Sequence, residues 1–264
     1  MAWGCPGGIP EGAWLGGSSM SEYQAKAQRL CVADDLAPGA TLACNAGQGH
    51  YLRHVLRLSA GDTVLLFNGR QGEWRAELLP GKAPAALIVR EQVRPQTGGP
   101  DVDYLFAPLK RARLDYMVQK ATEMGVARLR PVLTRHTTPE RVNLMRMRAN
   151  AVEAAEQCGI LRLPELHAPE RLQSVIAGWD IVRTLIFCDE ASRAGDPLAS
   201  LGALSRGPLG VLVGPEGGFA PDERELLSRQ PFVVAISLGP RVLRADTAAV
   251  AALALLNAVL GDWR

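Results

Sequence analysis

The chain lacks the sequence patterns of several common classes of site. It has no G-x-G-x-x-G and no glycine-rich loop followed by Lys-Ser/Thr, which argues against a dinucleotide-binding fold and a P-loop. Its five cysteines form no C-x-x-C, and its four histidines form no H-E-x-x-H, although His50 and His54 are one helical turn apart. We therefore predict no metal site. Scattered cysteines of odd number favour reduced thiols in a cytoplasmic protein.

A secretory signal and a membrane-spanning segment are also missing from the sequence. Residues 1–19 are rich in glycine and contain neither Lys nor Arg, whereas a signal peptide begins with basic residues. We predict that residues 1–19 form a disordered leader. The apolar stretch Ala248–Leu260 is too short to cross a bilayer, so we predict a buried helix there.

Positive charge is concentrated in one part of the chain. The formal net charge is only +2, but ten basic residues oppose three acidic ones between Lys110 and Arg148. This stretch carries +7, which leaves −5 for the remainder. Such a local basic stretch is typical of proteins that bind a polyanion. The alternative is a solvated helix face in a chain that prefers arginine to lysine.

The apolar pattern predicts an α/β protein with two domains joined by a linker. Residues 20–92 form a small β-rich domain, with a short helix at His50–Leu58 and strands at Thr63–Phe67 and Glu73–Leu79 joined by the hairpin signal Asn68-Gly69. Residues 93–100 have the composition of a linker. From residue 101 to 264, strands and helices alternate, which predicts a mainly parallel sheet covered on both faces.

The expected elements of this second domain follow from the apolar runs and the helical spacing of apolar residues. We predict strands at Tyr104–Ala107, Leu129–Leu133, Thr184–Cys188, Gly210–Val213 and Phe232–Leu238. Helices are predicted between and after them, at Arg113–Met124, Glu140–Gln157, Pro169–Ala177, Pro221–Arg229 and Asp246–Leu260.

Two strand-loop-helix units near the carboxyl terminus are the most informative feature. One apolar run ends in Gly214-Pro-Glu-Gly-Gly218, and a second ends in Gly239-Pro-Arg241. Glycine permits tight turns and a close approach of the backbone to a ligand. Both loops are expected at one edge of the sheet, where open α/β sheets bind ligands. We therefore predict a small-molecule pocket formed largely by backbone atoms.

Charged residues leave the ligand class of this pocket open. Glu216 repels phosphate and suits a neutral or cationic ligand. Arg241 and Arg244 are either exposed loop charges or a grip for an anion.

Together, the two loops resemble those of the ribosomal small subunit methyltransferase E family, within the SPOUT superfamily of knotted methyltransferases. Three further segments are similar to family motifs: His50–Asp62 resembles the N-terminal domain, Lys110–Gly125 the first helix, and Glu153–Gly159 the second helix signature. The resemblance covers residues 20–264. It implies a PUA-like β-barrel at residues 20–92 and a SPOUT-type domain with a trefoil knot at residues 101–264, in which the chain after residue 238 threads a loop.

The resemblance also implies an activity, which is methyl transfer from S-adenosylmethionine (SAM) to N3 of one uridine in 16S ribosomal RNA. N3 carries a proton and is a poor nucleophile until the proton leaves, so the enzyme must align the base and remove the proton. The target base must be splayed from the folded RNA. No metal is required. The family further implies a homodimer that pairs through the C-terminal region, where the apolar helix Ala248–Leu260 suits a buried seam.

The match assigns candidate roles to individual residues. Nine residues are candidates for holding SAM: Leu212, Gly214, Glu216, Gly217, Gly218, Leu238, Gly239, Leu243 and Thr247. Glu216 either faces the sulfonium or fixes its loop, and Thr247 either contributes a hydroxyl or is an ordinary residue of the first helical turn.

The catalytic and RNA-binding assignments are more open. Glu153 and Glu156 are candidate bases or an exposed helix face, and Arg244 is a candidate for stabilising the uracil anion while water takes the proton. Guanidinium groups grip phosphate with two prongs, and the RNA backbone candidates are Arg111, Arg113, Arg146 and Arg148.

One position departs from the family pattern, and two other functions stay open. Many relatives have Arg after Glu-Gln-Cys-Gly, where this chain has Ile160, and Arg162 substitutes only if the turn shifts. Besides the uridine methyltransferase, a second hypothesis is a related RNA methyltransferase that acts on another nucleotide, since the pocket motif would be the same. The third hypothesis is a non-catalytic RNA-binding protein with this fold, which SAM binding without methyl transfer would identify.

Overall fold

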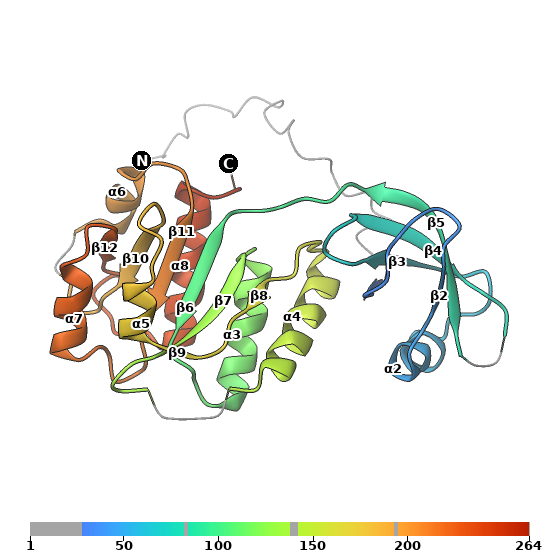
Figure 1. Ribbon diagram of the computed structural model, residues 1–264, viewed down its shortest axis with the longest axis horizontal. Coiled ribbons are helices and arrows are strands. Elements are labelled where there is room, and N and C mark those ends of the chain that lie inside the picture. Colours follow the sequence, from blue (N-terminus) through green and yellow to red (C-terminus); the bar gives the residue numbers. More distant parts are fainter. Residues whose placement is uncertain (1–27, 82–83, 138–141, 193–194, 264) are drawn as a thin grey trace, which may run out of the picture.

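The computed structural model describes residues 28–81, 84–137, 142–192 and 195–263 (Figure 1). The leader predicted at residues 1–19 lies outside the described residues. The chain forms a five-stranded mixed sheet in its N-terminal part and a larger parallel sheet in its C-terminal part. The predicted α/β class with a small β-rich region in front is confirmed.

The N-terminal sheet has the strand order β1-β3-β4-β5-β2 and curls around its own apolar core. Its strands are β1 (Arg29–Cys31), β2 (Thr41–Ala43), β3 (Thr63–Phe67), β4 (Glu73–Leu78) and β5 (Ala86–Arg94), with helix α2 (Ala46–His50) and the π-helix η1 (Tyr51–Val55) between β2 and β3. The predicted hairpin is confirmed, because β3 and β4 pair antiparallel. Its connection is a five-residue loop, in which the Asn68 side chain accepts hydrogen bonds from two backbone N–H groups.

The C-terminal sheet has the order β12-β10-β11-β6-β7-β8, with β9 pairing to β7, and all of its recorded pairs are parallel. The strands are β6 (Val102–Phe106), β7 (Arg128–Leu133), β8 (Glu165–Leu166), β9 (Glu170–Arg171), β10 (Thr184–Cys188), β11 (Leu209–Val213) and β12 (Val233–Ile236). The helices are α3 (Arg111–Glu123), α4 (Leu144–Cys158), α5 (Leu172–Ala177), α6 (Pro197–Gly202), α7 (Pro221–Ser228) and α8 (Ala245–Val259).

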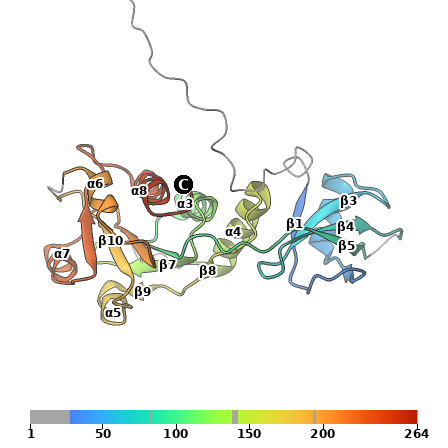
Figure 2. The ribbon, with the colours of Figure 1, turned by 90° about the horizontal axis from the view of Figure 1, so that it is seen from above.

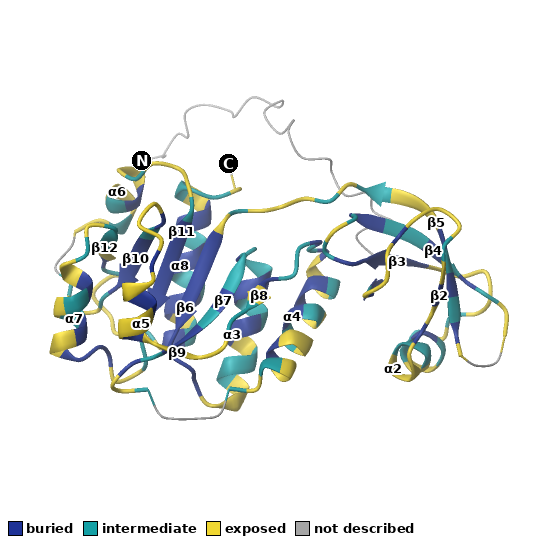
Figure 3. Ribbon diagram, viewed as in Figure 1, coloured by how far each residue is buried: buried dark blue, intermediate teal, exposed yellow. Residues whose placement is uncertain are grey.

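Helices lie on both sides of this sheet, as predicted (Figure 2). Side chains alternate along each strand, so Tyr104 and Phe106 pack into the core on the side of α3 and α8, whereas Leu105 packs toward α5 and α7. Both faces are apolar, and the central strands are buried along their length (Figure 3). None of the helices in the described part of the chain is long and apolar enough to cross a bilayer.

Several elements differ from the sequence prediction: the helix predicted at His50–Leu58, for example, is replaced by α2 and η1. Three other differences have a local reason. The helix predicted from residue 169 begins only at Leu172, because Glu170–Arg171 pair with β7 as strand β9. Helix α4 is preceded by Asn143, whose side chain accepts the Arg146 backbone N–H as an N-cap. Helix α6 was not predicted, although Asp196 at its N-cap and Pro197 at its first position are typical start signals.

The two sheets are joined through the carboxyl end of α4. Glu73 is fully buried and forms ion pairs with Arg29 and Arg94, at 2.8 Å in both cases. Arg94 also donates to the carbonyl of Gly159, the residue that ends α4. Buried charges require such complete pairing. Strand β5 ends at Arg94 and β6 begins at Val102, and the predicted domain limits at residues 92 and 100 stay predictions.

Two residues of this junction bear on the departure from the family pattern. Ile160 packs in an apolar cluster with Phe67 and Leu161, so it belongs to the contact between the two sheets. Arg162 donates to the carbonyls of Pro100 and Gly125, at 2.7 and 2.9 Å, and thereby holds the chain that enters β6.

Candidate functional site

A cavity of about 300 Å³ opens at the carboxyl edge of the parallel sheet, where three loops meet. It is lined by residues 188–190 at the end of β10, 213–218 at the end of β11, and 238, 239 and 241–243 before α8, with Ala245 and Ala248 of α8. We call it the glycine-loop cavity. The carboxyl ends of parallel strands share one edge, which explains why loops far apart in the sequence come together here.

Seven of the nine residues predicted to hold the cofactor line this cavity: Gly214, Glu216, Gly217, Gly218, Leu238, Gly239 and Leu243. The other two lie elsewhere. Leu212 is fully buried within β11 and packs toward α5 and α7. Thr247 is exposed in the first turn of α8, where its backbone N–H donates to the Asp246 carboxylate at 2.9 Å.

Two glycines of the first loop are required by their surroundings. A Cβ at Gly214 would lie 2.4 Å from Cε2 of Phe219, whose ring packs edge-on against Phe187. Gly218 has φ +67°, and a Cβ there would lie 2.4 Å from a Glu190 carboxylate oxygen. Side chains at these two positions would therefore distort the loop, which keeps its backbone close to the cavity.

The third loop of the cavity was missed by sequence reasoning. Asp189 and Glu190 follow β10 directly, and Arg224 of α7 binds both carboxylates. The strand at residues 184–188 was predicted, and its carboxyl end lies at the same sheet edge as the two glycine loops. This position was the sequence signal that could have identified Asp189 and Glu190. With Glu216, these residues place three carboxylates in the cavity lining, where each is paired with an arginine and Arg241 adds a positive charge.

Arg113 fastens the two predicted loops to helix α3. Its guanidinium donates to Asp246 at 3.0 and 3.1 Å and also pairs with Glu216. This hydrogen bond lowers the pKa of Asp246 and raises the pKa of Arg113. The Glu216 carboxylate is therefore paired with Arg113 and also lines the cavity, and its role toward SAM stays a prediction.

His136 is a second residue that the sequence did not single out for this edge. It lies in the turn after β7, and its Nδ1 is 3.0 Å from the carbonyl oxygen of Gly217 and 3.1 Å from that of Gly218. Carbonyl oxygens only accept hydrogen bonds, so Nδ1 must carry a proton and donate to them, which selects the Nδ1–H tautomer. His136 therefore braces the glycine loop from the side of β7.

The candidate catalytic residues do not gather at this cavity. Arg244 is exposed at the N-cap of α8, next to lining residues Leu243 and Ala245. Glu153 is exposed on α4, and Glu156 accepts the backbone N–H of Cys31 in β1 at 2.8 Å. Burial is the main cause that raises the pKa of Glu156. Both glutamates lie in the half of α4 that approaches the N-terminal sheet (Figure 1).

The four arginines predicted to bind RNA differ in their surroundings. Arg113 is committed to the two carboxylates described above. Arg146 forms a two-pronged ion pair with Asp115, and this pair lowers the pKa of Asp115. Arg111 and Arg148 are exposed, and among the described residues neither forms a direct ion pair.

The cysteines and acidic residues of the described ranges give no metal centre. Cys31, Cys44, Cys158 and Cys188 are free thiols. No group of three or more His, Cys, Asp or Glu residues is placed to hold a metal ion within the part of the chain that the structure describes.

Comparisons with known proteins match this architecture. An RNA methyltransferase domain family matches residues 97–257, and an RNA methyltransferase PUA domain family matches residues 45–87. The chain is 31% identical over 207 residues to Ribosomal RNA small subunit methyltransferase E of Rickettsia conorii, covering 78% of this chain and 84% of the relative. It is 34% identical over 245 residues to the protein of that name from a Synechocystis species, covering 89% and 78%.

A solved structure extends the comparison to three dimensions. It is a Legionella pneumophila protein, described as a methyltransferase and solved in complex with the bound cofactor SAM. The two chains superimpose with a TM-score of 0.79 at 28% sequence identity, over 90% of this chain and 99% of that chain.

Proposed function

Because the chain belongs to the ribosomal RNA small subunit methyltransferase E family, we propose that it transfers a methyl group from SAM to N3 of a specific uridine in 16S ribosomal RNA. The protein is a SAM-dependent RNA methyltransferase with a PUA-like domain in its N-terminal part. The identity of the uridine atom is the finer part of the proposal.

The observation that carries the proposal is the glycine-loop cavity. Gly214, Gly218 and Gly239 bring main-chain groups to its wall, and Ala245 and Ala248 of α8 provide an apolar surface. Asp189, Glu190 and Glu216 surround it with carboxylates, although each is paired with an arginine. When bound there, SAM supplies a methyl group already activated by its sulfonium. The residues of the chain hold it and orient it.

We propose that the uracil proton leaves without a carboxylate base from this chain. Glu153 and Glu156 lie on α4, and Glu156 already accepts a backbone N–H from the N-terminal sheet. Arg244 is exposed at the start of α8, beside two residues of the cavity wall. A guanidinium in this position stabilises the uracil anion, and water takes the proton.

Substrate RNA is proposed to lie across the basic stretch of α3 and α4. Arg111 and Arg148 are exposed and make no direct ion pair within the described ranges, which leaves them available for phosphate. Arg146 is oriented by Asp115, whose carboxylate also accepts from Asn150, while Arg113 acts inside the protein by holding the loops.

We also propose the assembly and chain path implied by the family. Helix α8 packs against α3, α6 and β11, so the chain returns from β12 across the middle of the sheet, in support of a knotted path after Leu238. Val250, Leu255 and Val259 of α8 are half-exposed apolar residues, which suits a homodimer seam. We propose that the dimer acts in the cytoplasm. Sedimentation velocity tests the dimer, and a monomer at micromolar concentration contradicts it.

The activity is tested by incubating the protein with SAM and either naked 16S ribosomal RNA or small subunits that lack the methyl group. We expect one added methyl, mapped by mass spectrometry to the base of one uridine. Methylation of N3 blocks the Watson–Crick edge, so reverse transcription should stop at the same nucleotide. A methyl on another nucleotide would support the related-enzyme hypothesis. SAM binding without any methyl transfer would favour a non-catalytic RNA-binding protein.

A further inference from the structure

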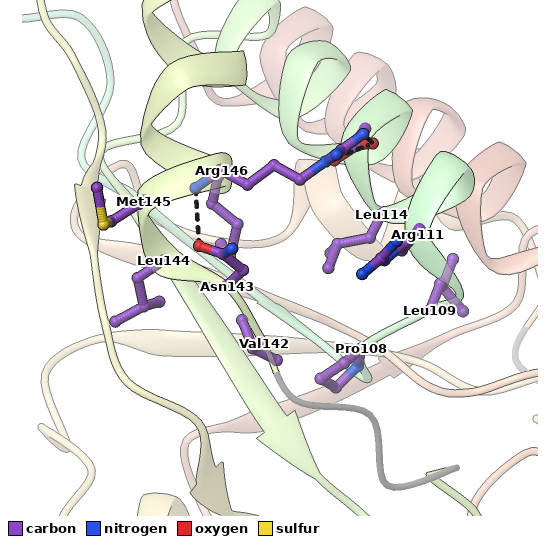
Figure 4. Close-up of a pocket in the computed structure, with 11 residues that line it drawn as sticks. Pro108, Leu109, Arg111, Leu114, Val142, Asn143, Leu144, Met145 and Arg146 are labelled. Atoms are coloured by element: carbon purple, nitrogen blue, oxygen red, sulfur yellow. Dashed lines mark hydrogen bonds and ion pairs between the residues drawn. The ribbon is translucent and has the colours of Figure 1, made fainter.

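A second and larger cavity, of about 610 Å³, lies between the amino ends of α3 and α4. We call it the α3–α4 cavity. Its walls are largely apolar and include Leu109, Leu114, Val142, Leu144 and Met147. Figure 4 shows that Leu114 of α3 points into this space from the side opposite Val142 and Leu144. The volume falls within the range of small-molecule sites, and its apolar walls suit a planar, weakly polar group.

Cations stand at the rim of the α3–α4 cavity. Arg111 is exposed and makes no direct ion pair within the described ranges. Arg146 is fixed by its two-pronged pair with Asp115, and Asn150 donates to the same carboxylate at 2.7 Å. Two guanidinium groups against one carboxylate leave a net positive rim. A group with an apolar, flat part and an attached anion therefore matches both the walls and the rim.

A third, smaller cavity shares lining residues with both the α3–α4 cavity and the glycine-loop cavity. This middle cavity, of about 240 Å³, is lined by Pro108, Leu109, Lys110, His136 and residues 215–217. It shares Pro108 and Leu109 with the α3–α4 cavity and residues 215–217 with the glycine-loop cavity. The three spaces form one row along the carboxyl edge of the sheet.

We propose that the α3–α4 cavity binds the base of an unpaired nucleotide adjacent to the target uridine in the RNA. The inference rests on the proposed function, because it takes the glycine-loop cavity as the SAM site. An RNA strand whose target base is splayed exposes the neighbouring base as well. That base lies against the apolar walls, and its phosphate lies between Arg111 and Arg146. Sequence context next to the target is then read by this cavity.

The test couples a change in the RNA with a change in the cavity. The RNA is a 16S fragment containing the target uridine, either intact or abasic at the nucleotide on its 5′ or its 3′ side. The variant Leu114→Trp fills the cavity, and Tyr116→Trp places the same side chain on the exposed surface of α3 as a matched control. Affinity is measured by fluorescence anisotropy, and methyl transfer is measured separately.

For one of the two neighbours, the abasic RNA should bind the unaltered protein about 10-fold more weakly than intact RNA, which is within the range for losing one base contact. Leu114→Trp should weaken binding of intact RNA to a similar degree, and the abasic site should then cost little more. Tyr116→Trp should behave like the unaltered protein. Additive effects of the two changes, or no effect of either abasic site, would overturn the proposal.

A second measurement does not depend on whether Leu114→Trp folds. RNA with 4-thiouridine at the same neighbouring position is crosslinked to the unaltered protein by ultraviolet light. Peptides containing residues 108–114 or 142–147 should carry the crosslink, and crosslinks found only elsewhere would refute the site. Non-additive effects of the abasic site and Leu114→Trp on RNA binding, without any methyl transfer, would contradict the proposed activity and leave the nucleotide site intact. Methyl transfer with additive effects would contradict the nucleotide site and leave the activity intact.

Discussion

Replacing Gly214 by Ala should destabilise the protein through one defined contact. The added Cβ would lie 2.4 Å from Cε2, 2.9 Å from Cδ2 and 3.0 Å from Cζ of Phe219. Phe219 is 4% exposed, and its ring meets Phe187 edge-on with centroids 4.9 Å apart, so it has little room to move. Gly214 does not have a positive φ, and the effect is therefore steric alone.

Overpacking a core contact of this type typically costs about 1–3 kcal/mol, which we expect for Gly214→Ala in urea unfolding. Phe219→Leu shortens the side chain and should cost roughly 1–2 kcal/mol through the space left behind. Because the shorter side chain removes the clash, the double variant should be more stable than the sum of the two losses predicts, by ~1 kcal/mol or more. SAM affinity should fall in Gly214→Ala and recover in the double variant.

Gly202→Ala is the matched control for this substitution. Gly202 is exposed in the last turn of α6, and a Cβ there meets nothing within 4 Å. This change should be neutral or stabilising by up to ~1 kcal/mol, since alanine favours the helix. If Gly214→Ala matches the unaltered protein, or if the losses in the double variant simply add, the clash with Phe219 does not govern the loop.

Three further predictions concern other contacts. His136→Ala should weaken SAM binding about five-fold, because one lost hydrogen bond costs ~1 kcal/mol. His136→Asn keeps a donor for the Gly217 carbonyl, so its SAM affinity should stay within about two-fold of the unaltered protein. Equal SAM affinities of the two variants would show that this hydrogen bond does not hold the loop. Burial raises the folded-state pKa of Glu156, so folding favours its protonated form and stability is lost as the pH rises above the ordinary glutamate pKa. Glu156→Gln should therefore lose less stability than the unaltered protein over this rise in urea melts. The hydrogen bond from Arg113 lowers the pKa of Asp246, so its contribution is lost as the pH falls through the folded value, and Asp246→Asn should be less acid-sensitive; parallel pH profiles would refute either linkage.

Local sequence patterns determined the framework of the protein. Apolar runs of strand length, separated by helical spacing, predict the alternating units, and a parallel sheet follows because such connections return to the same edge. The strand Thr63–Phe67 was predicted with the bounds that the structure gives it. The two glycine loops were identified because Gly and Pro stop a strand in a recognisable way, and parallel strands bring both loops to one side.

Tertiary structure alone decided which side chains meet. Arg113 pairs with Asp246, which lies 133 residues along the chain, and Glu156 with the backbone of Cys31, at a separation of 125 residues. A basic or acidic residue has the same local signature whether it faces RNA or a partner inside the protein. His136 shows no motif, and its role follows only from the meeting of the β7 turn with the Gly217 loop. Periodicity is set by neighbours along the chain, whereas electrostatic partners are set by the packing of distant elements.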